Sequence, residues 1–119
     1  MTLSEWKDLL DYVLKNFKIR YDDFATEAYL PYRKRRIVGF VRYDRKEILF
    51  DQGICGETEK VTWAHEALSI YYYSILKIIR HDDEIEKEAR ALCKNRAFNE
   101  VLSGYIQKLK GVKPAPDGQ

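Results

Sequence analysis

The sequence has only two cysteines, Cys55 and Cys93, and neither belongs to a Cys-x-x-Cys pair. A zinc knuckle built from cysteines is therefore excluded. We interpret the two residues as reduced thiols. The alternative is a single disulfide, which intracellular proteins of hyperthermophiles do form. Asparagine and glutamine together number six, and such scarcity is typical of thermophile chains.

Long apolar runs and an excess of one charge are also missing. No stretch of about 18 apolar residues occurs, which excludes a membrane-spanning helix and predicts no membrane association. The first ten residues, MTLSEWKDLL, lack the basic and apolar segments of a secretory signal, so we expect a cytoplasmic protein. With 21 basic and 19 acidic residues the net charge is only +2, which excludes a broadly basic nucleic-acid-binding protein.

What the sequence does contain is helical periodicity at both ends. Residues 2–17 predict an amphipathic helix that packs on the core, and Thr2 and Glu5 have the spacing of a capping box. The apolar positions of this helix are Leu3, Trp6, Leu9, Leu10, Val13, Leu14 and Phe17. Near the other end, residues 98–109 repeat the pattern, and Gly111 is expected to end that helix.

The middle of the chain predicts a β-hairpin and two helices. Residues 37–51 are rich in β-branched and aromatic residues around a polar turn, as in a hairpin. Residues 58–80 predict a long, mostly buried helix with Thr58 as N-cap, and Asp82 or Asp83 is expected to cap the next helix. Ile75 and Ile79 are spaced for burial in the long helix.

These elements predict a single α+β domain over residues 1–111, with a small antiparallel hairpin or sheet packed on three to four helices. Residues 112–119, with prolines at 114 and 116, are expected to form a disordered tail. Residues 18–36 are the least regular part, since Pro31 forbids a central strand or helix interior there.

A run of four cations stands in this irregular part: Arg33, Lys34, Arg35 and Arg36. Its functional interpretation is contact with nucleic-acid phosphates. The alternative, which we favour, is a solvated lead-in to a strand whose charges deter edge pairing. No second basic segment supports the nucleic-acid interpretation.

The segment Thr62-Trp63-Ala64-His65-Glu66, which follows the predicted hairpin, resembles the active-site helix of small ImmA/IrrE-type zincins. The downstream segment Glu86-Lys87-Glu88-Ala89 resembles the Glu-x-x-Ala segment that supplies a third metal ligand in that family. The resemblance covers residues 36–93 and implies a zincin-like fold.

The resemblance also implies chemistry at the site. His65 and Glu86 would bind zinc, and Glu66 would act as general base toward a peptide substrate. Tyr72 or Tyr73 would assist the oxyanion. The second histidine of the motif is replaced here by Ser69, a poor zinc ligand. We therefore expect a degenerate site and a protein that acts by binding another protein. One alternative is an active zinc metallopeptidase, and the other is a chance His-Glu pair in an unrelated small α+β protein.

The predicted helix 58–80 conflicts with this metal site. An unbroken helix would carry His81 about 24 Å from His65, at ~1.5 Å per residue, and would leave Glu86 short of His65. The site requires a break near Tyr73, where no glycine or proline forces one. Without a metal site, His65 is expected to be satisfied by a carboxylate such as Glu86, and Glu66 to be exposed or ion-paired.

The triplet Tyr71-Tyr72-Tyr73 is the remaining unusual feature. At least one of these rings must face away from the core of a helix. We interpret them mainly as packing or as part of a protein interface. Base stacking on single-stranded nucleic acid is the alternative.

Overall fold

Helix α1 (Leu3–Asn16) begins at the predicted capping box. The computed structural model of the chain describes residues 1–25 and 37–111. In it, Thr2 Oγ1 accepts a hydrogen bond from the Glu5 N–H at 3.1 Å, and Glu5 Oε1 accepts one from the Thr2 N–H at 2.8 Å. The predicted apolar stripe is confirmed, because Trp6, Leu10 and Val13 are fully buried.

Three strands form one small sheet in the order β1-β3-β2. β2 (Gly39–Arg42) and β3 (Glu47–Asp51) pair antiparallel, which confirms the predicted hairpin. β1 (Lys18–Asp22) pairs parallel with β3. The sequence interpretation was wrong on this point, because it left residues 18–22 irregular and expected an antiparallel sheet. The sheet of the described residues is mixed.

The central strand β3 is buried on both faces. Ile48 and Phe50 belong to the main core under the helices, whereas Leu49 packs with Phe24 and Phe40 on the other face. The sequence of a strand that is buried on both faces is a continuous apolar run rather than an alternation of apolar and polar residues. The segment Ile48-Leu49-Phe50 has that pattern.

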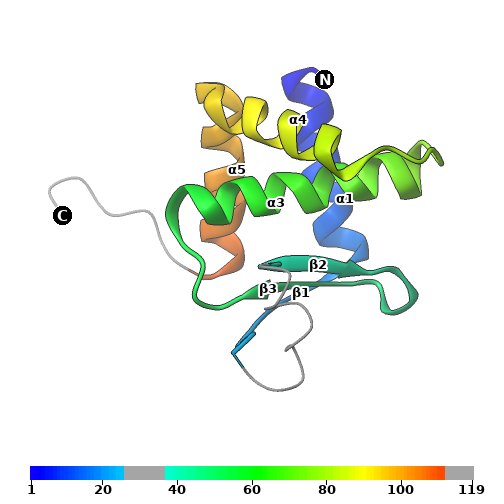
Figure 1. Ribbon diagram of the computed structural model, residues 1–119. Coiled ribbons are helices and arrows are strands. Elements are labelled where there is room, and N and C mark those ends of the chain that lie inside the picture. Colours follow the sequence, from blue (N-terminus) through cyan, green and yellow to red (C-terminus); the bar gives the residue numbers. More distant parts are fainter. Residues whose placement is uncertain (26–36, 112–119) are drawn as a thin grey trace, which may run out of the picture.

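Helix α3 (Gly56–Ile70) lies between the sheet and α4 (Asp82–Lys94), and α1 and α5 (Arg96–Leu109) cross behind it (Figure 1). Its N-cap is Cys55, not the predicted Thr58. The regular helix ends at Ile70, and the turn η3 (Tyr71–Ile75) has π-helical hydrogen bonding. The predicted helix over residues 58–80 is therefore wrong at both ends.

The chain after η3 turns back instead of continuing the helix. Lys77 adopts a left-handed conformation (φ 57°), which stops helical propagation. Ile75 and Ile79, predicted to be buried, are exposed, and Ile79 retains 96% of its accessible surface. Once the helix has ended, these positions have no core to face.

Two further helices complete the domain. α4 (Asp82–Lys94) has His81 as its N-cap, so the predicted capping by Asp82 or Asp83 is wrong, and both acids lie in the first turn instead. In the first turn, the two carboxylates still interact favourably with the positive end of the helix dipole. α5 (Arg96–Leu109) is capped by Asn95, and Gly111 follows its end with a φ of 71°.

The described residues thus form an α+β fold with four α-helices and a three-stranded mixed sheet. No helix within them is long and apolar enough to cross a membrane. Cys55 is exposed and Cys93 is buried, and both thiols are free, so the alternative of a disulfide is not supported. The predicted tail, residues 112–119, lies outside the described part of the chain.

Candidate functional site

A cleft of about 990 Å³ opens between β2 and the first half of α4, with α3 as its floor. β2 contributes Gly39 and Val41 to the wall, and α3 contributes His65 and Glu66 to the floor. The opposite wall is the start of α4 together with the preceding loop. The cleft therefore joins a sheet edge to a row of titratable side chains.

Gly39 sets the distance between β2 and α3. A Cβ atom at this position would lie 2.7 Å from Thr62 Cγ2 and 3.1 Å from Phe50 Cδ1. Such a separation is well inside van der Waals contact, so any other residue would push the strand away from the helix. Glycine here keeps the sheet edge close to the floor of the cleft.

The main chain of β2 also faces the cleft. The Asp51 N–H donates to the Val38 carbonyl at 2.9 Å, so Val38 and Asp51 form a hydrogen-bonded pair. Bonded and non-bonded pairs alternate along an antiparallel ladder. The N–H and C=O groups of Gly39 and Val41 therefore point away from β3, and no main-chain group of the described residues pairs with them.

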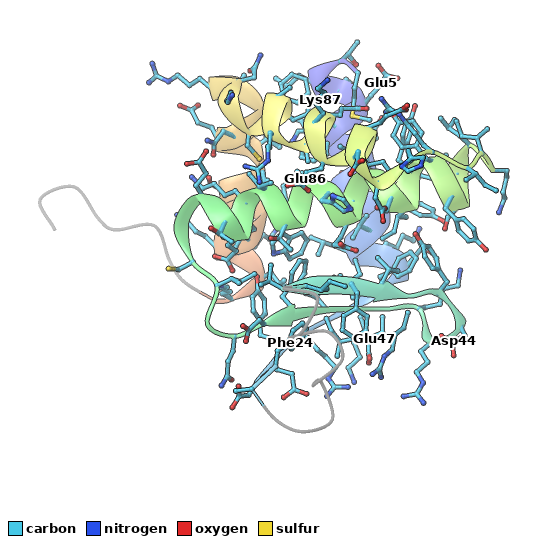
Figure 2. The ribbon with its side chains drawn as sticks, in the orientation of Figure 1. Glu5, Phe24, Asp44, Glu47, Glu86 and Lys87 are labelled. Carbon is cyan, nitrogen blue, oxygen red and sulfur yellow. The ribbon has the colours of Figure 1, made fainter. Side chains whose placement is uncertain are left out.

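His65 is held by α4. Its Nδ1 lies 2.7 Å from Glu86 Oε2, which confirms the predicted pairing of this histidine with a carboxylate. The carboxylate can only accept, so Nδ1 carries the proton, and Nε2 faces Asp82 Oδ1 at 3.9 Å. Glu86 lies between α4 and α3 (Figure 2) and also pairs with Arg90 at 3.1 Å.

Glu66 is buried, with 8% of its surface exposed, and this corrects the expectation of an exposed or ion-paired residue. Among the described residues, no hydrogen bond or ion pair reaches its carboxylate. Burial, followed by the charges of Asp82 and Glu86, raises its pKa to about 8. Desolvation and like charge both disfavour the ionised carboxylate.

The early end of α3 brings α4 to His65. Arg80 donates to both Tyr72 Oη and Glu88, and its guanidinium lies 4.6 Å from the centre of the Tyr72 ring. These contacts fix the loop along α4 after the left-handed turn at Lys77. The conflict that an unbroken helix would have created between His65 and Glu86 therefore does not arise.

The two tyrosines implied by the resemblance are placed differently. Tyr72 Oη donates to Glu88 at 2.6 Å, so its hydroxyl is directed along α4. Burial, followed by this bond and the Glu88 charge, raises the pKa of Tyr72 to about 12. Tyr73 is 58% exposed and lines the cleft. The predicted outward-facing ring is thus Tyr73.

Tyr43 is a cleft residue that the sequence interpretation missed. Its ring centre lies 4.5 Å from that of Tyr73. Burial raises its pKa to about 12, with Glu66, Tyr73 and Asp82 adding to the effect, which puts it beside the carboxylates. The spacing in the predicted hairpin was the available signal, since Gly39 and Val41 alternate on one face of β2 and Tyr43 follows at the same interval, in the 3-10 turn Tyr43–Arg45.

The donors of the cleft do not fit the zinc site that the resemblance implies. Ser69 Oγ donates to the His65 carbonyl at 2.9 Å and is turned toward the backbone. Glu86 is bonded to His65 itself rather than standing beside it as a second ligand. No group of three His, Cys, Asp or Glu side chains suited to a metal ion occurs among the described residues. Arg33, Lys34, Arg35 and Arg36, the proposed phosphate contacts, lie outside those residues.

Comparisons with protein-family models, with curated proteins and with solved structures gave no match to this chain.

Proposed function

We propose that this chain is a zincin-like protein with an incomplete metal site, and that it acts by binding an extended segment of a partner protein in the cleft. The observation that carries the proposal is the position of β2. Gly39 and Val41, whose N–H and C=O groups point away from β3, line the same cleft as His65 and Glu66.

An extended peptide can add to such an edge as a further strand. Main-chain hydrogen bonds then supply affinity, and pockets for alternate side chains supply specificity. The cleft offers apolar contact as well, because Ile78 and Ile79 in the loop before α4 line it and are exposed. A groove with an open strand edge, an apolar lip and a polar floor suits a peptide better than a small apolar ligand.

The test is binding of a fluorescein-labelled library of nonapeptides, measured by polarisation, to the wild type and to Val41→Pro. The substitution removes the outward N–H without removing a ladder bond to β3. We expect binding to the wild type and a loss of at least about 10-fold in the variant, as for one or two strand-addition hydrogen bonds.

Val41→Ala is the matched control, since it trims the same side chain but keeps the N–H. Equal losses in the two variants would contradict strand addition. No binding of any peptide to the wild type would overturn the proposed function.

An active zinc hydrolase is the second candidate, favoured only by the presence of His65, Glu66 and Glu86 in the lining of one cleft. Metal content of the purified protein separates the two candidates. We expect less than one zinc per chain and no change in His65→Ala. Stoichiometric zinc that is lost in His65→Ala would contradict the incomplete site.

A further inference from the structure

Three carboxylates are buried among the described residues, and they differ in their partners. Glu47 pairs with Arg20 at 3.3 Å, and Glu59 accepts from Tyr21 at 2.7 Å. Glu66 alone of the three has no such contact. A largely buried carboxylate without a partner is costly, because it has lost part of its hydration without gaining a hydrogen bond or a cation.

The other two buried carboxylates also have a second cation near them. Arg42 lies 3.6 Å from Glu47, and Lys110 contacts Glu59. The fold therefore supplies positive charge to each buried carboxylate outside the cleft. It does not do so for the one that lines the cleft, although basic side chains are abundant in the sequence.

The surroundings of Glu66 add negative charge instead. Asp82 and Glu86 line the same cleft. Arg80 and Arg90 line it too, but Arg80 pairs with Glu84 and Glu88, and Arg90 pairs with Glu86. The proton on His65 Nδ1 is likewise engaged by Glu86. None of these basic groups pairs with Glu66, so a bound cation would favour its ionised form.

Aromatic rings stand beside this floor. Tyr43 and Tyr73 both line the cleft, with ring centres 4.5 Å apart. A cation above a tyrosine face is attracted by the ring quadrupole, and a guanidinium also stacks on it. Carboxylate and aromatic ring together favour a planar cation over an ammonium.

We infer that the Glu66 carboxylate receives the guanidinium of an arginine side chain in the bound peptide segment. The inference rests on the proposed function and specifies its ligand. Arginine fits better than lysine because its fork of N–H donors matches a carboxylate in two places and its plane can lie against Tyr43 or Tyr73.

The experiment compares nonapeptide libraries in which one position is fixed as arginine, lysine, citrulline or glutamate. Citrulline keeps the shape of arginine but carries no charge. For the wild type we expect arginine to bind about 10- to 100-fold more tightly than citrulline, as for a charge-assisted hydrogen bond in a desolvated site. In Glu66→Gln the ratio is expected to fall to about one.

Glu59→Gln is the matched control, because Glu59 lies on the same helix, is equally buried and does not line the cleft. It is expected to keep the wild-type ratio, and circular dichroism checks that both variants are folded. Peptides that bind without preferring arginine to citrulline or to lysine would overturn this inference and leave the proposed function intact. An arginine preference that survives in Glu66→Gln would also overturn it. A failure of every peptide to bind would overturn both.

Discussion

A carboxyl group that is buried without a cation makes the stability of its protein depend on pH in an unusual direction. Glu66 is such a group, with a pKa raised to about 8 by burial and by the charges of Asp82 and Glu86. The unfolded chain ionises the same group near pH 4.3. Between these two values the folded state holds a proton that the unfolded state has released, so folding becomes less favourable as the pH rises.

Glu66→Gln removes this effect. We expect the variant and the wild type to have similar unfolding free energies at pH 4, where the carboxyl is protonated in both states. At pH 8 the variant should be more stable by on the order of 5 kcal/mol. Urea unfolding at pH 4, 6 and 8 measures the difference.

Glu59→Gln tests whether the effect is specific. This variant deprives Tyr21 and Lys110 of a buried partner, so it should be less stable than the wild type at neutral pH. A difference between Glu66→Gln and the wild type that does not change with pH would contradict the raised pKa.

At the scale of elements, the sequence predicted the helices and strands whose positions follow from hydrophobic periodicity and helix caps. The capping box of α1, the hairpin of β2 with β3, and the helices α4 and α5 follow from local patterns. β1 was missed because only Ile19 and Tyr21 of its five residues are apolar. β1 is stabilised as a strand by hydrogen bonds to β3, which is distant in the sequence. The residues of β1 alone therefore do not predict the pairing.

The end of α3 was not predictable for a similar reason. No glycine or proline stands at Tyr71–Ile75, and the apolar pattern continues to Ile79. The helix ends through a left-handed Lys77 and through the contacts of Arg80 with Tyr72 and Glu88, which form only in the folded state. The candidate site was therefore predicted in its residues His65, Glu66 and Glu86, but not in its geometry.

The close approach of β2 to α3 gives a prediction at this scale. Gly39→Ala places a Cβ atom 2.7 Å from Thr62 Cγ2 and should lower the unfolding free energy by about 1–2 kcal/mol through overpacking. Thr62→Ser in the same chain removes that methyl and keeps a hydroxyl able to bond the Thr58 carbonyl, so most of the loss should be recovered. Chemical denaturation of the four proteins of this double-mutant cycle measures the coupling.

Gly104→Ala is the control for the glycine-to-alanine change itself. Nothing lies within 4 Å of a Cβ at this position of α5, so the variant should gain about 0.5–1 kcal/mol from helix propensity. Additive effects of Gly39→Ala and Thr62→Ser would contradict the proposed contact.

At the scale of the molecule, the helices and the sheet enclose one main core, and Cys93 lies inside it while Cys55 does not. Burial raises the pKa of the Cys93 thiol to about 11. The reactive thiolate is therefore scarce at neutral pH and is also shielded from reagents. The two thiols should differ strongly in their accessibility in the native state.

Alkylation with iodoacetamide at pH 8, followed by mass spectrometry, tests this difference. We expect Cys55 to be modified rapidly and Cys93 at least ~100-fold more slowly, at a rate set by opening of the fold. In Cys55→Ser the slow reaction should remain, and in 6 M urea both cysteines of the wild type should react alike. Equal native rates would contradict the burial of Cys93.

The strand order has a consequence for the sequence of events during synthesis. Within the described residues, β1 and β2 do not pair with each other, and each pairs with β3, which leaves the ribosome after both. Until residue 51 emerges, the nascent chain carries two strands that lack the central partner they have in the finished sheet. The strand that lines the cleft can therefore pair with β3 before α3, the floor of the cleft, has emerged from the ribosome.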